Sequence, residues 1–169
     1  MTQKEFLNIV MPFKDKVFRL AKRLLVSTEE AEDATQEVLL KLWRNKKKMA
    51  EYRNIEAFSM TMTKNFCFDK LKSKQAQNLK LVHSNYESKN TPLQKQMELK
   101  DSVSWVAKII EDLPEQQKLI IQLRDIEDYD FDEIAKILDM NNASVRVALS
   151  RARKTIREKL TNTHNYGVR

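Results

Sequence analysis

Residues 131–160 read FDEIAKILDMNNASVRVALSRARKTIREKL, and this stretch predicts two short helices joined by a tight turn. From Phe131 to Leu138, apolar side chains recur at intervals of three and four, as on one face of a helix. The segment from Asp139 to Asn142 favours a turn and tolerates left-handed backbone, and Asn141 or Asn142 can cap the next helix. Two amphipathic helices around such a turn match the helix-turn-helix motif.

The second of these helices has an apolar face and a basic face. Its apolar face is predicted to consist of Val145, Ala148, Leu149, Ala152, Ile156 and Leu160. The opposite face carries Arg146, Val147, Ser150, Arg151, Arg153, Lys154 and Arg157. Between Ala143 and Leu160 there are six basic side chains and one acid, which suits DNA because each neutralised phosphate releases condensed counterions. A basic, solvated face on an ordinary helical hairpin is the alternative.

The composition favours an all-α protein with an anionic partner. Among 169 residues there are only one glycine and three prolines, while long stretches show helical periodicity. So few glycines exclude Gly-rich phosphate-binding loops. The formal net charge of +7 favours an acidic partner, and the length allows one domain or two small ones.

The sequence contains no catalytic constellation. Cys67 is the single cysteine, so there is no disulfide framework, and no Cys/His cluster has the spacing of a zinc site. We therefore expect no enzyme activity, cofactor, metal or small-molecule substrate. The N-terminus lacks the pattern of a signal peptide, and no run approaches the roughly 20 apolar residues that span a bilayer, so we expect a cytoplasmic or nuclear protein.

Three helices are predicted in the first half of the chain. The first should run from about Pro12 to Val26, with a shorter helical piece before it and a break or kink near Met11, because proline fits poorly inside a helix. We expect the second over residues 28–48 and the third over residues 55–74. The third is apolar nearly all round, which predicts the buried centre of a small domain, with Asn65 and Asp69 as a buried, hydrogen-bonded pair.

The predicted helix over residues 28–48 has two stripes. Its core face is predicted to consist of Ala31, Ala34, Val38 and Leu42. Roughly opposite lie Asp33, Gln36, Leu40 and Trp43, a mixed polar and apolar stripe that suits a protein partner. The alternative is that Leu40 and Trp43 pack on another helix of the same domain.

The chain becomes strongly basic after this stripe. Lys46, Lys47 and Lys48 lead into a short connection in which Tyr52 lies among cations. Opened DNA needs cations for its backbone and an aromatic face for an unpaired base, and this connection offers both.

Composition changes again over residues 77–98, which are rich in Gln, Asn, Ser and Lys and predict a flexible linker. The predicted organisation is therefore two small helical domains, residues 1–76 and 99–162. A disordered polar tail should follow at residues 163–169.

Three stretches outside the predicted linker share one resemblance. Residues 29–43 read EEAEDATQEVLLKLW, residues 55–74 read IEAFSMTMTKNFCFDKLKSK, and residues 113–160 include the helix-turn-helix. In this order and spacing they resemble an extracytoplasmic-function (ECF) sigma factor of bacterial RNA polymerase. The strongest matches are Asp33, Gln36 and Glu37, the Ser-Val-Arg run at 144–146 and the Arg-Ala-Arg run at 151–153.

The resemblance implies a cytoplasmic transcription initiation factor, with RNA polymerase core, promoter DNA and an anti-sigma protein as partners. We expect a monomer when the protein is free. The residues implied to bind core polymerase are Asp33, Gln36, Glu37, Leu40 and Trp43. Those implied to bind the start-proximal promoter element are Lys46, Lys47, Lys48, Tyr52, Arg53 and Asn54. Those implied to bind the upstream element are Asn142, Ser144, Arg146, Val147, Ser150, Arg151, Arg153, Lys154 and Arg157.

Two departures from the family's pattern affect the second domain. Asp139 stands where the family usually has a small residue, and Val147 and Ala148 stand where many relatives are polar or basic. Val147 offers methyl contact, as to thymine, in place of hydrogen bonds, so the promoter sequence stays open. Two other functions fit parts of the chain. A conventional helix-turn-helix regulator would not need the Asp33 stripe, and a helical adaptor would show no salt-dependent DNA affinity.

Overall fold

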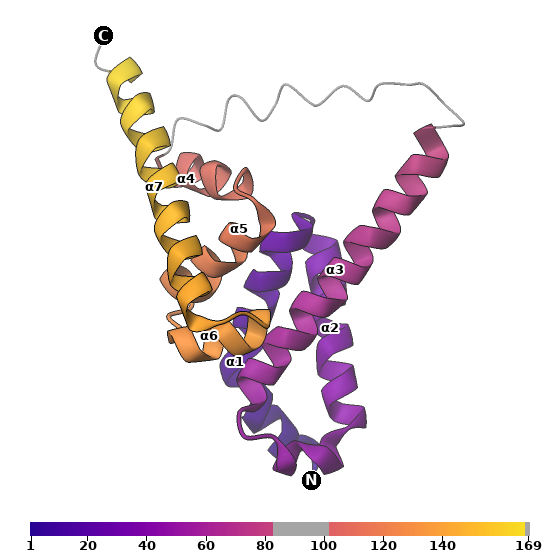
Figure 1. The fold of residues 1–169 in the computed structure, drawn as a ribbon. Coiled ribbons are helices and arrows are strands. Elements are labelled where there is room, and N and C mark those ends of the chain that lie inside the picture. Colours follow the sequence, from indigo (N-terminus) through magenta and orange to yellow (C-terminus); the bar gives the residue numbers. More distant parts are fainter. Residues whose placement is uncertain (83–101, 168–169) are drawn as a thin grey trace.

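The computed structural model describes residues 1–82 and 102–167, and every regular element in these ranges is a helix. In chain order the elements are α1 (Gln3–Leu25), α2 (Thr28–Arg44), the 3₁₀ helix η1 (Lys46–Glu51), α3 (Ile55–Val82), α4 (Ser102–Glu111), α5 (Glu115–Ile121), the π-helical turn η3 (Gln122–Ile126), α6 (Phe131–Leu138) and α7 (Asn142–Gly167). The first three α-helices form one unit and the last four another (Figure 1). The predicted all-α fold with two small domains is confirmed. Most of the predicted linker lies outside the described residues.

α1 is a single helix that continues through Pro12, so the predicted break is wrong. A capping box starts it: the Glu5 N–H donates to Thr2 Oγ1 at 3.2 Å, and the Thr2 N–H donates to Glu5 Oε2 at 2.7 Å. Proline removes one backbone hydrogen bond. Burial of Phe6 and Val10 in the same core as the rest of α1 nevertheless keeps the helix continuous.

α2 begins where the sequence predicts, with Ser27 Oγ accepting the N–H of Glu30 at 3.4 Å. The predicted core face is confirmed, since Ala31, Ala34, Val38 and Leu42 are all buried. α2 ends at Arg44, earlier than predicted, and the chain tightens into η1. This winding accompanies the burial of Met49, which is 1% exposed and anchors η1 to the core.

α3 is longer and less buried than predicted. It continues to Val82, so the first residues of the predicted linker are helical. Its buried stripe consists of Ser59, Met60, Thr63 and Cys67. The buried hydroxyls are satisfied within the helix, as Ser59 donates to Ile55 O and Thr63 to Ser59 O, both at 2.7 Å. Asn65 and Asp69 are exposed, so the predicted buried pair is wrong. α3 buries one narrow stripe and leaves much of its apolar surface only partly covered.

The second domain turns sharply between α5 and α6. The buried side of α5 and η3 includes Leu119, Ile120 and Leu123. The π-helical turn is followed by Asp128 in left-handed backbone, with φ of 60°. This path carries Tyr129 into the interior, where it is 5% exposed.

α6 and α7 form the predicted helix-turn-helix. Asp130 caps α6 in a capping box with Glu133, and α6 buries Ile134 and Ile137 most completely. The spacing of three and four from Phe131 predicts Ile134, Ala135 and Leu138 on the apolar face and leaves Ile137 out. Ile137 is buried because α6 packs on α3 as well as on α7. α7 continues to Gly167, so the backbone of residues 163–167 is helical and not a disordered tail.

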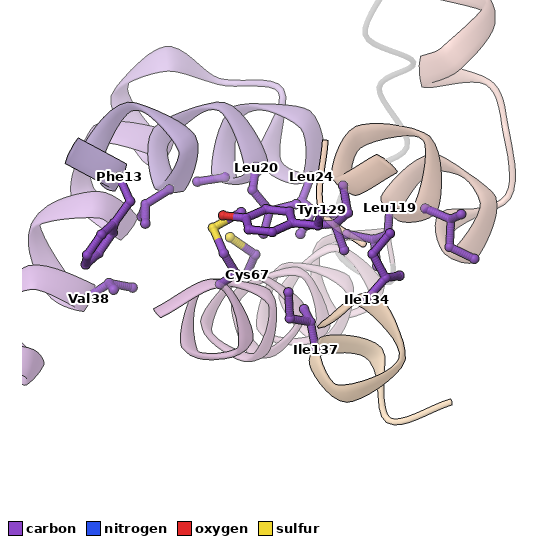
Figure 2. Close-up of a cluster of buried hydrophobic side chains, with 14 of the residues drawn as sticks. Phe13, Leu20, Leu24, Val38, Cys67, Leu119, Tyr129, Ile134 and Ile137 are labelled. Carbon is purple, nitrogen blue, oxygen red and sulfur yellow. The ribbon is translucent and has the colours of Figure 1, made fainter. Parts of the chain in front are cut away.

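One hydrophobic cluster extends through both domains. It includes Phe13 and Val38 in the first domain and Ile134 and Ile137 in the second (Figure 2). Tyr129 lies in the middle of this cluster (Figure 2). α1 contacts α5 and η3, while α3 contacts α6, so the two domains pack directly against each other.

Candidate nucleic-acid interface

The turn between α6 and α7 fixes the start of the basic helix. Asp139 adopts left-handed backbone, with φ of 52° and ψ of 51°, and so does the work that a glycine often does at a helix end. Asn141 Oδ1 accepts the N–H of Ser144 at 2.7 Å, which makes Asn141 the capping residue and decides between the two predicted asparagines. Asn142 donates from Nδ2 to Asp132 Oδ1 at 2.7 Å and ties α7 to α6.

α7 presents its basic side to solvent. Its buried side is led by Val145 and Ala152, which have no exposed surface. The exposed predicted residues are Ser144, Arg146, Val147, Ser150, Arg151, Arg153, Lys154 and Arg157, while Asn142 is half-buried. Val147 is 48% exposed and is a large apolar side chain in this otherwise polar row. The structure thus brings the predicted upstream-reading residues onto one accessible face, and their DNA contacts stay predictions.

Two of these arginines are held by neighbouring side chains. The Arg146 guanidinium lies 4.5 Å from the Phe131 ring centroid, and its Nε donates to Asn142 Oδ1 at 2.8 Å. Arg153 donates to the Asp125 carboxylate from Nε at 3.1 Å and Nη2 at 2.5 Å, and these bonds raise the pKa of Arg153. A DNA phosphate would have to compete with Asp125 for Arg153.

Two further residues border this face and carry no signal in the sequence. The Arg124 guanidinium lies 4.7 Å from the Phe131 ring centroid. Gln116 lines an open groove of about 670 Å³ together with Val147 and Arg151. Neither residue belongs to a periodic pattern, and only the packing of α5 and η3 against the helix-turn-helix brings them to this place.

The predicted start-proximal residues divide between a cleft and η1. Tyr52, Arg53 and Asn54 line one cleft of about 530 Å³ with residues of α3, including Phe58. The rings of Tyr52 and Phe58 are stacked, with centroids 4.2 Å apart and 17° between their planes. Asn54 Oδ1 accepts a backbone N–H at 3.0 Å and caps α3. The cleft thus combines an aromatic pair with an exposed cation, Arg53.

The three predicted lysines lie on η1 and are not among the residues that line this cleft. The Lys46 ammonium is 3.6 Å from the centroid of the Trp43 ring, a cation–π contact that turns it toward α2. Lys47 and Lys48 are exposed. Lys46 is therefore more closely associated with the predicted docking stripe than with the cleft.

The docking stripe on α2 is partly exposed and partly packed. Asp33, Gln36 and Leu40 are exposed, and Glu37 and Trp43 are half-buried. Trp43 packs edge-on against Phe6 of α1, with ring centroids 5.1 Å apart and planes at 70°. The two sequence interpretations thus apply to different members, since Leu40 faces solvent and Trp43 packs within the domain.

α1 extends this stripe with apolar side chains that were missed in the sequence. Leu7 and Met11 are 43% and 55% exposed, and they line a groove of about 490 Å³ with Leu40 and Trp43.

Among residues 1–82 and 102–167, no group of three or more His, Cys, Asp and Glu side chains could hold a metal ion. Within the same ranges, no helix has the length and apolar character needed to cross a membrane. Burial raises the pKa of Cys67 to about 12, which keeps its thiol protonated and unreactive.

Two protein-family models match this chain, one in each domain. The family model described as "Sigma-70 region 2" matches residues 9–77, and the one described as "Sigma-70, region 4" matches residues 104–156. Together these ranges take in more than two thirds of the chain.

Relatives and solved structures agree with these matches. The chain is 24% identical to "ECF RNA polymerase sigma factor SigW" of Bacillus subtilis, over 94% of this chain and 90% of that protein. It is 26% identical to "ECF RNA polymerase sigma-E factor" of Escherichia coli K12, over 94% and 87% of the two chains. The fold is shared with sigma factor RpoE of Bartonella quintana, solved in complex with the anti-sigma factor NepR, with a TM-score of 0.77 at 20% identity over 94% and 98% of the two chains. It is also shared with CnrH, solved with the cytosolic domain of CnrY, with a TM-score of 0.68 at 16% identity over 95% and 90%.

The chain belongs to the sigma-70 family, and within it to the ECF sigma factors. It is a promoter-specific transcription initiation factor.

Proposed function

We propose that this sigma factor binds RNA polymerase core through the outer face of α1 and α2 and reads promoter DNA through two separate surfaces. The observation that carries the proposal is α7, a helix buried along one side and lined with exposed cations along the other. A turn with left-handed Asp139 sets this helix against α6. In helix-turn-helix proteins, the second helix enters the major groove with such a face.

The upstream element is read along α7. Arg146, Ser150 and Arg151 lie toward the N-terminal half, which enters the groove in this architecture. Arginine can grip guanine through two hydrogen bonds, whereas the Val147 methyl groups suit thymine. Lys154 and Arg157 lie further along, where the helix passes the phosphates, and both are exposed.

The start-proximal element binds at the cleft beside α3. The stacked rings of Tyr52 and Phe58 line the cleft and supply aromatic surface for an unpaired base, and Arg53 offers a cation to the backbone. Lys47 and Lys48 extend the cationic surface along η1.

Core polymerase docks on the stripe of α2. Asp33 and Gln36 supply polar contacts, and Leu40 lies beside the exposed Leu7 and Met11 of α1. Exposed apolar side chains rimmed by polar ones are typical of protein-binding surfaces.

Family membership supports two further proposals, one on regulation and one on location. RpoE of Bartonella quintana was solved with the anti-sigma factor NepR, and we propose that an anti-sigma protein likewise occupies the binding surfaces of this chain. We further propose that the chain is a cytoplasmic monomer when free and acts by binding alone, without catalysis.

Transcription with purified core polymerase from the source bacterium tests the proposal. Core alone, core with this chain, and core with an Arg151→Glu variant should be compared on a library of genomic fragments. We expect discrete start sites only with the unaltered chain. Tight duplex binding without core-dependent initiation would instead indicate a conventional helix-turn-helix regulator, and no salt-dependent DNA affinity would indicate an adaptor.

A further inference from the structure

Two arginines share one aromatic ring at the start of the helix-turn-helix. The guanidinium of Arg146 on α7 lies 4.5 Å from the centroid of the Phe131 ring, and that of Arg124 in η3 lies 4.7 Å from the same centroid. Both are cation–π contacts, in which the face of the ring offers partial negative charge to the guanidinium. Because Phe131 is the first residue of α6, one ring connects η3, α6 and α7.

The ring is held in place by the protein around it. Phe131 is half-buried and packs against the hydrophobic cluster. Arg124 is also half-buried, and its Nη1 donates to the carbonyl of Tyr129 at 2.9 Å, two residues before the ring. Arg146 is the more exposed of the two cations. The ring is therefore a fixed surface against which an exposed arginine is placed.

A short chain of hydrogen bonds also holds Arg146. Asp132 Oδ1 accepts from Asn142 Nδ2 at 2.7 Å, and Asn142 Oδ1 accepts from Arg146 Nε at 2.8 Å. A side-chain amide donates at its nitrogen and accepts at its oxygen, so both bonds require the same orientation of Asn142. Since Nε is engaged, the guanidinium presents its terminal Nη1 and Nη2 groups to a ligand.

This arrangement lowers the cost of reading a base with Arg146. An arginine loses much rotamer freedom when it becomes fixed, and that loss weakens binding unless it occurs before the ligand is bound. Two N–H groups held in one plane match the O6 and N7 acceptors of guanine. A ring that only packed α6 would act independently of Arg146, so the two roles have different experimental consequences.

We propose that Phe131 is a positioning residue for the upstream promoter element: together with Asp132 and Asn142, it directs the Arg146 guanidinium toward one base pair. This inference rests on the proposed function of α7 as the helix that reads this element. In this role Phe131 touches no base and acts only through Arg146. It sharpens the preference at one base pair and leaves the contacts of Lys154 and Arg157 with phosphates unchanged.

The test compares Phe131→Leu, Phe131→Tyr, Arg146→Ala and the double variant Phe131→Leu/Arg146→Ala, each as the full chain bound to core polymerase. Leucine keeps an apolar side chain for the packing of α6 and removes the ring, whereas tyrosine keeps the ring face. Phe18→Leu makes the same change at another half-buried phenylalanine, on α1, and is the matched control. Asn142→Ala, which releases Arg146 Nε, serves if circular dichroism shows that Phe131→Leu does not fold.

The probe is a library of promoter duplexes with a randomised upstream element, and sequencing of the bound fraction gives the preference at each base pair. We expect Arg146→Ala to abolish the preference at one base pair and Phe131→Leu to lower it there about fivefold. Phe131→Tyr and Phe18→Leu should match the unaltered chain. The double variant should show no loss beyond that of Arg146→Ala, because the ring acts through this arginine.

Three results overturn the proposal: an equal loss at every base pair in Phe131→Leu, an unchanged preference in that variant, or a further loss in the double variant. If the unaltered chain shows no preference at any base pair, the proposed function fails and this inference fails with it. A preference that Phe131→Leu leaves intact contradicts this inference alone, so the two failures are distinguishable.

Discussion

The two surfaces proposed to bind DNA differ in how the free protein presents them. The cations of α7 lie on an outer face that the first domain does not cover, whereas the Tyr52 cleft is shared with the acidic start of α6. The upstream surface is held by the buried side of one long helix, and the start-proximal surface by a short 3₁₀ turn. The difference teaches that one fold can present one cationic surface openly on a helix and line another with acidic side chains of a neighbouring domain.

The largest effect should come from the residue that anchors the start-proximal surface. Met49→Ala should lower the free energy of unfolding by about 2–5 kcal/mol, because Met49 is 1% exposed and truncation leaves a cavity. Met11→Ala makes the same chemical change at a side chain that is 55% exposed, and it should stay within about 0.5 kcal/mol. Urea unfolding of both variants measures the contrast. Equal small losses would show that η1 is not anchored by Met49.

The residues of the upstream surface should divide into those that contact bases and those that contact phosphates. Arg151→Ala should cost about 1–3 kcal/mol at one base pair and relax preference there. Lys154→Ala should weaken all sequences alike and lower the salt slope by about one unit. Binding to a panel of upstream elements at several salt concentrations separates these outcomes. If Arg151→Ala weakens every sequence equally, the reading face of α7 has been assigned wrongly.

The stability that Tyr129 contributes at the contact between the two domains should depend on pH. Burial, reinforced by the bond to Glu56, raises the pKa of Tyr129 above the usual value of 10.0. A raised folded-state pKa contributes stability that is present below pH 10 and declines as the pH rises through and beyond that value. Tyr129→Phe should cost about 1 kcal/mol at neutral pH and remove this decline. Urea unfolding at pH values on either side of 10 compares the two proteins, and parallel losses in both would contradict the prediction.

Substitutions in the docking stripe should have different effects from substitutions in either DNA surface. Replacing Asp33 and Gln36 together with Ala should weaken core polymerase binding, while unfolding free energy changes by no more than about half a kcal/mol because both side chains are exposed. Pull-down with core polymerase and thermal unfolding measure the two effects. A large loss of stability would show that the stripe is internal packing.

The elements that depend on local periodicity could be predicted from the sequence. The buried faces of α2 and α7 follow the three-and-four spacing of apolar residues, and the helix starts at Ser27 and Asn141 follow capping chemistry. Continuity of α1 through Pro12 could not be predicted in this way, since it depends on a core shared by both halves of the helix.

Contacts between residues far apart in the sequence could not be predicted from local patterns. Arg19 and Glu127 are 108 positions apart, and each reads as an ordinary charged surface residue in its own helix or turn. The predicted burial of Asn65 and Asp69 was wrong for a different reason. The nearly all-apolar pattern suggested burial on sides of α3 that no helix in the described ranges fully covers. Pattern identifies faces, but only the fold decides which faces meet.

Distance measurement between the domains tests the central claim most directly. Spin labels at Glu51→Cys on η1 and Glu158→Cys on α7 occupy exposed positions, and buried Cys67, with its raised pKa, should resist labelling. Pulsed electron paramagnetic resonance should give one narrow distance for the free chain and a longer one once core polymerase is bound. The same distance in both states, or a broad distribution in the free chain, would contradict the account.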